Sequence, residues 1–262
     1  MKITVFTCNQ PRHNYLINKL SLIADKIYVI QEVTEHKYLK KHRNNIKNIK
    51  NEYFQKVNKA ELKLFGMNSV SSKNINILSI PKGEINNYDF NKFKKYLSSD
   101  LFVIFGSSIL KNNLYKFLVK KNTYNIHMGI SPYYRGTDCN FWALYHENYH
   151  LVGASIIKLS KKVDAGDIFY HDLAPFKINK FEYTMNSVKC AIDNFAKIVA
   201  QNKLKLFIPQ KQNFELTLKI STKKDFNRQI IREFNRKKTK VKKIKNNIHL
   251  INNMLLKKIC KV

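Results

Sequence analysis

Short apolar runs alternate with stretches of helical periodicity along the first half of the chain. The β-branched and apolar runs predict strands at residues 2–7, 26–31, 75–80, 101–105 and 123–127. Near-helical spacing predicts helices around residues 15–22, within 37–65, and at 88–97 and 110–119. Strands that alternate with helices in this way favour an α/β fold with a doubly wound, mostly parallel sheet.

The pattern changes in the second half of the chain. It predicts a helix at residues 141–146, a strand at 152–159, and helices at 181–201 and 225–234. Residues 203–262 contain 18 basic and 3 acidic side chains, with a basic run at 237–245. We therefore predict a catalytic α/β domain over residues 1–202 and a short, basic, partly helical C-terminal extension over residues 203–262.

The composition of the chain limits the classes of protein to which it can belong. A hydrophobic content of 44% indicates a folded chain. The longest apolar run, residues 101–110, is interrupted by small polar residues and is shorter than the ~20 residues of a membrane span. The first eight residues are too short an apolar stretch for a secretory signal. We expect a cytoplasmic protein without a membrane contact, and with four widely separated cysteines we expect neither disulfides nor a metal.

The net charge of +30 first suggests a protein that binds nucleic acid. Only six of the 48 basic residues are arginines, however, whereas a protein selected to grip phosphates favours arginine. The chain is also rich in Asn, Ile, Tyr and Phe, as an AT-rich coding sequence would produce. We attribute most of the charge to this bias, while an anionic substrate remains compatible with it.

Two polar motifs carry the candidate chemistry. Asn125 and His127 lie at the end of a predicted strand, and their side chains share one face because they are two residues apart. A carboxylate-bearing turn follows later in the chain, with the sequence Asp164-Ala165-Gly166-Asp167. Together these side chains could form an acid/base site beyond the carboxyl ends of parallel strands.

The segment that contains both motifs resembles the folate-dependent formyltransferase family. The matching pieces, in order, are Asn125-Ile126-His127, Pro132, Arg135-Gly136, Trp142-Ala143, Val152-Gly153-Ala154-Ser155-Ile156 and Val163-Asp164-Ala165-Gly166-Asp167. The match is strong over residues 101–172 and weaker before them. The resemblance implies the Rossmann-like formyltransferase fold and 10-formyltetrahydrofolate as the donor of a formyl group to an amine.

The resemblance also implies roles for individual residues. Asn125, His127 and Asp164 would be the catalytic residues: the first two stabilise negative charge on the formyl oxygen, and Asp164 relays protons. The donor would contact a set of loop residues, namely Phe105, Gly106, Ser107, Gly129, Ile130, Pro132 and Gly136. No covalent enzyme intermediate and no metal are required.

The acceptor amine is less clearly indicated. The segment after the first strand reads Cys-Asn-Gln-Pro-Arg-His and lacks the glycine-rich turn with which family members that act on a ribonucleotide bind phosphate. Arg12 could contact an anion there instead, and Tyr134 and Arg135 are further candidates for substrate contacts.

The length of the chain further limits the range of expected acceptors. About 60 residues follow residue 201, which is short for the C-terminal β-barrel of methionyl-tRNA formyltransferases. By elimination, we expect an anionic, nucleotide-linked amino sugar. A tRNA substrate and a non-catalytic RNA-binding module remain alternatives, and a homodimer is compatible with the sequence.

Overall fold

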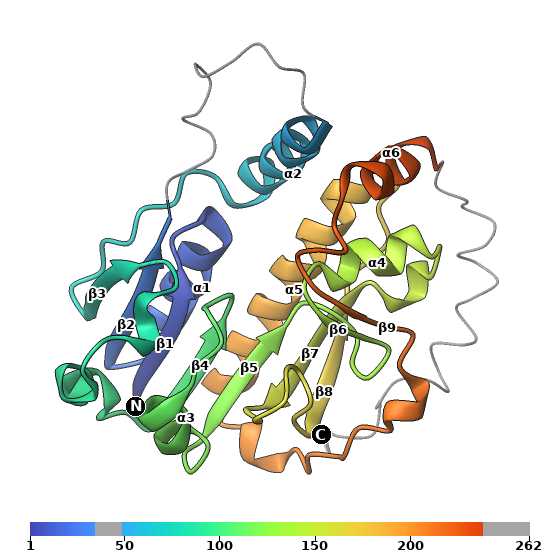
Figure 1. The fold of residues 1–262 in the computed structure, drawn as a ribbon. Helices are drawn as coiled ribbons and strands as arrows, with labels where there is room; N and C mark the ends of the chain where they lie inside the picture. Colours follow the sequence, from blue (N-terminus) through green and yellow to red (C-terminus); the bar gives the residue numbers. More distant parts are fainter. Residues whose placement is uncertain (35–48, 238–262) are drawn as a thin grey trace.

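A seven-stranded sheet forms the centre of the computed structural model, which describes residues 1–34 and 49–237 (Figure 1). Its strand order is β3-β2-β1-β4-β5-β7-β8. The strands are β1 (Lys2–Cys8), β2 (Lys26–Val33), β3 (Ile75–Pro81), β4 (Leu101–Phe105), β5 (Thr123–His127), β7 (Gly153–Lys158) and β8 (Ile168–Leu173). The first five are parallel, and β7 and β8 extend the sheet in antiparallel register. The predicted α/β class with a mostly parallel sheet is confirmed.

Helices cover both faces of this sheet. The α-helices of the described residues are α1 (Pro11–Ser21), α2 (Ile49–Phe65), α3 (Asn112–Leu118), α4 (Cys139–Tyr145), α5 (Lys180–Ala200) and α6 (Arg228–Arg236). The helix expected at residues 88–97 is a 3-10 helix, Phe90–Leu97. Among the described residues, no helix is long and apolar enough to cross a membrane.

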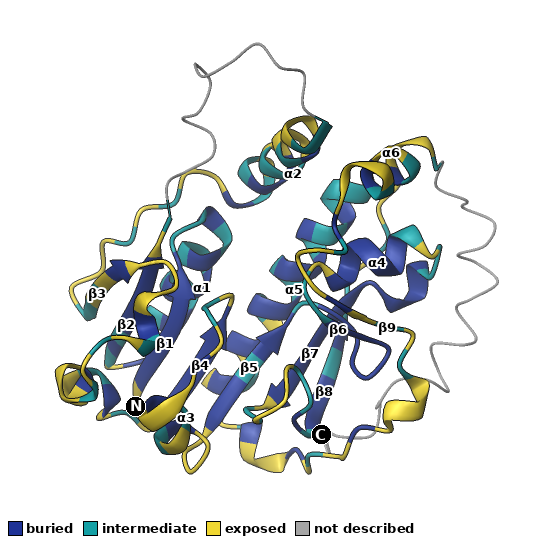
Figure 2. Cartoon of the chain, in the orientation of Figure 1, coloured by how far each residue is buried: buried dark blue, intermediate teal, exposed yellow. Residues whose placement is uncertain are grey.

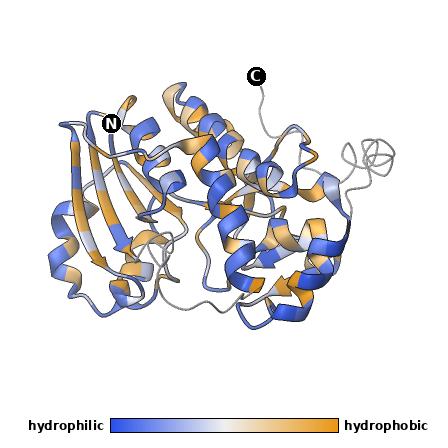
Figure 3. Cartoon of the chain, turned by 90° about the horizontal axis from the view of Figure 1, so that it is seen from above, coloured by the Kyte–Doolittle hydropathy of each residue, from blue (hydrophilic) through white to orange (hydrophobic). Residues whose placement is uncertain are grey.

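The buried side chains separate into layers on either side of the sheet (Figure 2). One cluster joins α1 and α5 to the sheet through residues such as Leu16, Ile192 and Phe195, none of which is exposed. A second cluster, with Phe93, Phe102 and Leu118, lies on the opposite face under the 3-10 helix and α3. The apolar strands are therefore enclosed on both sides, as their continuous hydrophobic runs predict. In Figure 3 the strands carry much of the hydrophobic colouring, and the helices show polar residues on their outer surfaces.

The described part of the predicted extension packs on the rest of the chain. Strand β9 (Lys219–Ser221) pairs in parallel with β6 (Tyr134–Gly136), in a two-stranded sheet separate from the large one. Phe234 of α6 packs against Phe141 of α4, with ring centroids 4.5 Å apart. A domain boundary at residue 202 stays a prediction. Nearly all of the basic run at residues 237–245 lies outside the described residues.

A buried carboxyl on β8 gives the fold a testable pH dependence. Burial raises the pKa of Asp172 to about 6, although Asn194 donates a hydrogen bond of 2.9 Å to its Oδ1. Because the pKa in the folded state exceeds the usual value of 3.8, the stabilisation that this carboxyl provides is complete below pH ~4 and is lost as the pH rises through 6.

Asp172→Asn should remove this pH dependence. Relative to the wild type, the free energy of unfolding of the variant should increase by about 2 to 3 kcal/mol between pH 4 and pH 7.5, the linkage value of the shift. Urea denaturation of both proteins at several pH values measures the difference. A difference that is constant with pH would contradict the prediction.

Candidate active site

The carboxyl ends of β1, β4 and β5 meet at one edge of the sheet, and a pocket of about 950 Å³ opens there. Its lining includes Cys8 from the end of β1, Phe105 from β4 and His127 from β5. The wall opposite these strand ends includes Tyr53 and Glu61 of α2. Such an edge is where open α/β sheets bind ligands, so the fold positions the pocket as the strand pattern predicts.

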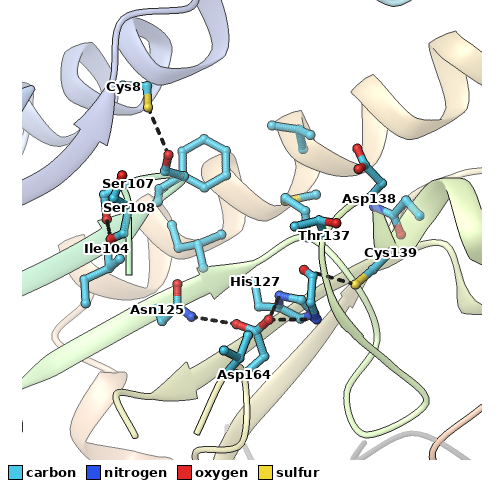
Figure 4. Close-up of a pocket in the computed structure, with 18 of the residues that line it drawn as sticks. Cys8, Ile104, Ser107, Ser108, Asn125, His127, Thr137, Asp138, Cys139 and Asp164 are labelled. Atoms are coloured by element: carbon cyan, nitrogen blue, oxygen red, sulfur yellow. Dashed lines mark hydrogen bonds and ion pairs between the residues drawn. The ribbon is translucent and has the colours of Figure 1, made fainter. Parts of the chain in front are cut away.

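The three predicted catalytic residues come together at this pocket (Figure 4). The turn between β7 and β8 reaches the face of β5 that carries Asn125 and His127. Asn125 Nδ2 donates to Asp164 Oδ1 at 3.3 Å, and His127 Nδ1 lies 3.4 Å from Asp164 Oδ2. The backbone N–H of Gly136 also donates to Asp164 Oδ2, at 3.0 Å. The carboxylate is therefore the centre of the cluster: Asn125 and Gly136 donate to it, and the His127 ring lies beside it.

The hydrogen bonds of His127 define where its protons lie. Its Nε2 is 3.1 Å from the carbonyl oxygen of Tyr134, which can only accept, so Nε2 carries a hydrogen. Its Nδ1 faces the Asp164 carboxylate, and a proton on Nδ1 would lie between imidazole and carboxylate. Only 6% of the His127 side chain and 13% of the Asp164 side chain are exposed, which strengthens the interaction between them.

The residues predicted to contact the donor fall into two groups. Phe105, Gly106, Ser107 and Gly136 line the pocket. Gly106 has a positive φ of 71°, and a Cβ there would lie 2.4 Å from His13 Cε1, so the turn after β4 requires glycine.

The second group lies outside the pocket wall. Gly129, Ile130 and Pro132 are buried and do not line the pocket. A Cβ on Gly129 would lie 2.8 Å from His127 Nε2, so this glycine makes room for the His127 ring. The structure places these residues behind the site, and their contact with a donor stays a prediction.

The residues predicted to contact the substrate are also divided. Arg12 lines the pocket and forms an ion pair of 2.8 Å with Glu61, a carboxylate that is only 1% exposed. Tyr134 and Arg135 are buried and do not line the pocket. Asn148 donates to the Tyr134 hydroxyl at 2.8 Å, and Arg135 donates to the carbonyl oxygen of Val163 at 2.8 Å. In the structure, Tyr134 and Arg135 support the loops around the site.

Sequence reasoning missed an ion pair beside the pocket. Glu32 follows the predicted second strand, and its fully buried carboxylate lies 2.8 Å from Lys82 Nζ. Burial raises the pKa of Glu32, but hydrogen bonds from Lys82 and two backbone amides outweigh it, so the net shift is downward. The amides belong to Gly83 and Ser108, so this carboxylate ties the loops after β3 and β4 to β2. The signal in the sequence was a glutamate directly after a buried strand.

The described residues were also compared with the ligand sets that metal ions require. Across residues 1–34 and 49–237, no group of three or more His, Cys, Asp and Glu side chains could hold a metal ion. Cys8, Cys139 and Cys190 are free thiols. The polar groups gathered at the site are the Asn125 amide, the His127 imidazole and the Asp164 carboxylate.

Solved structures share this architecture. A 4-N formyltransferase from Francisella tularensis superposes with a TM-score of 0.54 at 18% sequence identity, over 86% of this chain and 77% of that chain. Phosphoribosylglycinamide formyltransferase from Anaplasma phagocytophilum superposes with a TM-score of 0.52 at 15% sequence identity, over 84% of this chain and 99% of that chain. The chain has the formyltransferase fold.

The resemblance that the sequence motifs indicated is thereby confirmed for the fold. A further formyltransferase structure, an N-formyltransferase from Helicobacter canadensis in complex with folinic acid and dTDP-3-aminofucose, has a TM-score of 0.51 at 12% identity, over 87% of this chain and 73% of that chain. No protein-family model matches the sequence, and the search of curated proteins gave no match. At these sequence identities, the solved structures show that the chain shares the formyltransferase fold.

Proposed function

We propose that this protein transfers a formyl group from 10-formyltetrahydrofolate to the primary amine of a nucleotide-linked amino sugar. The observation that carries the proposal is the cluster of Asn125, His127 and Asp164 at a pocket of the formyltransferase fold. Amide, imidazole and carboxylate are the groups that acyl transfer to an amine requires when no covalent intermediate forms.

Each residue has a distinct task in the reaction. The amine nitrogen attacks the formyl carbon, the bond from that carbon to the folate nitrogen breaks, and that nitrogen takes up the proton which the amine loses. Asn125 donates one amide N–H to Asp164, and its second N–H can stabilise the negative charge that develops on the formyl oxygen. Asp164, with His127, accepts the proton of the attacking amine and returns it to the leaving nitrogen.

The pocket supports a folate as donor. Its volume of about 950 Å³ lies at the upper end of the range typical of small-molecule sites. The apolar side chains of Ile104 and Leu110 line it next to the polar backbone of Gly106 and Ser107, a combination that suits a flat heterocycle with polar edges. The Helicobacter canadensis neighbour is described as a complex with folinic acid, a related folate.

The charge around the pocket supports an anionic acceptor. Six basic residues line it, Arg12, Lys82, Lys158, Lys161, Lys162 and Lys223. Arg12 and Lys82 are paired with Glu61 and Glu32, which leaves four lysines of the lining against the carboxylates of Asp138 and Asp164. A diphosphate would be attracted to this excess of positive charge. The Helicobacter canadensis neighbour was solved with the nucleotide-linked amino sugar dTDP-3-aminofucose, which supports the same class of acceptor here.

Incubation with a panel of amines tests the proposal. The purified protein is mixed with 10-formyltetrahydrofolate and, in separate reactions, a free amino sugar, nucleotide-linked amino sugars, glycinamide ribonucleotide and methionyl-tRNA. We expect the mass gain of one formyl group on a nucleotide-linked amino sugar, and none when the folate is omitted.

Other outcomes assign a different function. Formylation of methionyl-tRNA alone would replace the proposed acceptor with tRNA. If no amine is formylated while RNA binds with an affinity that falls steeply with salt, the protein is an RNA-binding module on this fold.

A further inference from the structure

The backbone around Asp164 adopts an unusual conformation. Asp164 has a φ of 48°, in the left-handed region that a non-glycine residue seldom occupies. Gly166 then passes so close to β7 that a Cβ on it would lie 1.9 Å from the carbonyl oxygen of Lys158. A backbone conformation of this kind persists only where the surroundings hold it in place. The contacts that hold this turn therefore decide where the Asp164 carboxylate points.

One side chain from the C-terminal extension reaches this turn. Gln212 Nε2 donates to the carbonyl oxygen of Asp164 at 2.8 Å and to that of Gly166 at 2.7 Å. The two bonds span the turn on either side of Ala165. Gln212 is only 9% exposed, so water does not compete freely for these bonds.

The chemistry of these contacts requires an amide at residue 212. Both partners are carbonyl oxygens and can only accept, so a group with two hydrogens on one atom is needed to satisfy them together. A glutamate in this place would present oxygens to oxygens at any pH where it is ionised. A methionine would have a similar length and would offer no hydrogen at all.

The same extension also supports the other side of the carboxylate. Gly136 donates its N–H to Asp164 Oδ2, and it lies opposite Ser221 in the β6–β9 pair. A Cβ on Gly136 would lie 2.0 Å from the carbonyl oxygen of Ser221, and the backbone N–H of Thr137 donates to that oxygen at 3.0 Å. The segment after residue 202 thus contacts both the turn that carries Asp164 and the strand that donates to it.

We propose that Gln212 is a positioning residue for catalysis, which fixes the Asp164 carboxylate against Asn125 and His127. The inference rests on the proposed formyl transfer for its kinetic consequence. The turn has other attachments, since Lys158 N donates to Asp167 O at 2.9 Å and Arg135 donates to the carbonyl oxygen of Val163. Loss of Gln212 should therefore leave the turn attached at both ends and release the backbone of Asp164 between them.

Kinetics of Gln212→Met provide the first test. We expect kcat to fall by about 10- to 100-fold, the effect of a displacement of a reacting group by roughly 1 Å. The KM values for folate and acceptor should change by less than about threefold, because Gln212 binds the turn and neither substrate. Gln210→Ala is the matched control: its side chain is exposed two residues away, and only its backbone pairs with Ile168. This control should keep wild-type kinetics.

Gln212→Glu adds a pH signature. The charged groups held at this turn are Asp164, Asp167 with its partner Lys158, and Arg135, which donates to the carbonyl oxygen of Val163. Because residue 212 is only 9% exposed and faces two carbonyl oxygens, the new carboxyl should take up a proton more readily than usual and then donate one O–H to a carbonyl of the turn. The kcat of the variant relative to that of the wild type at the same pH should therefore rise as the pH falls from 8 to 6, whereas the ratio for Gln212→Met should stay constant.

A structural measurement separates this inference from the proposed reaction. The amide proton of Gly136, which donates to Asp164, should exchange faster with solvent in Gln212→Met than in the wild type or in Gln210→Ala, as read by NMR. This result stands even if no amine is formylated. Wild-type kcat together with unchanged exchange in Gln212→Met would overturn the proposal. So would a Gln212→Met protein that fails to fold, since Gln212 would then be a structural residue.

Discussion

Replacing Asp164 with asparagine should lower kcat for formyl transfer by about 10²- to 10⁴-fold, the range for loss of a general acid/base group. Asparagine has nearly the same shape, so the turn can keep its contacts while the site loses its proton acceptor. Asp164 receives hydrogen bonds from Asn125 and Gly136, and an amide oxygen can still accept one of them. The measurement is a single-turnover assay at saturating folate and acceptor, so that binding does not enter the rate.

Asp167→Asn is the control for this prediction. Asp167 belongs to the same turn, but its side chain is 37% exposed and pairs weakly with Lys158, at 3.7 Å. The control removes the same charge from the same segment, and its kcat should stay within about twofold of the wild type, as expected for an exposed pair. Equal losses in both variants would mean that the charge of the turn matters and the position of Asp164 does not.

His127→Ala should lower kcat by about 10²- to 10⁴-fold, the range for loss of a group that takes part in proton transfer. The ring contacts Asp164 through Nδ1 and Tyr134 through Nε2, so its removal leaves the carboxylate without its proton partner. His127 is 5% exposed, and the cavity should also lower the melting temperature. Thermal unfolding measured beside the kinetics separates the two effects.

His146→Ala serves as the control for His127. His146 contacts the Tyr134 hydroxyl at 3.2 Å and does not line the pocket. We expect this variant to keep its kcat. An unimpaired His127→Ala enzyme would show that the proposed mechanism is wrong, whatever the acceptor.

The large sheet could be predicted because its signals are local. The apolar runs of β1, β2, β4 and β5 are short and continuous, as strands buried on both faces should be. Strand β8 was missed because aromatic and polar residues are mixed in Ile168–Leu173 without a regular alternation. Strands β6 and β9 have three residues each and pair across more than 80 positions, and no local pattern encodes such a contact.

The residues of the candidate site likewise divide into those that could be predicted from the sequence and those that could not. Asn125 and His127 could be predicted to share one face because they lie two residues apart at a strand end, and the resemblance to the formyltransferase family added Asp164 to them. Gln212 could not, because a glutamine in an irregular segment carries no sign that two carbonyl oxygens distant in sequence need its hydrogens. Tyr134 and Arg135 were predicted to contact the substrate because their side chains can bind an anion or a ring. In the structure they are buried and form hydrogen bonds with Asn148 and with the carbonyl oxygen of Val163, contacts that the local sequence does not indicate.

The pairing of β6 with β9 has a consequence for synthesis of the chain. Gly136 is translated long before Ser221, yet its place beside the Asp164 carboxylate depends on Ser221. A nascent chain can assemble the large sheet as its strands emerge, but β6 can pair with β9 only after residue 221 has left the ribosome. All strands of the large sheet precede β9 in the sequence, so the two-stranded sheet beside Asp164 is completed after the strands of the large sheet have been made.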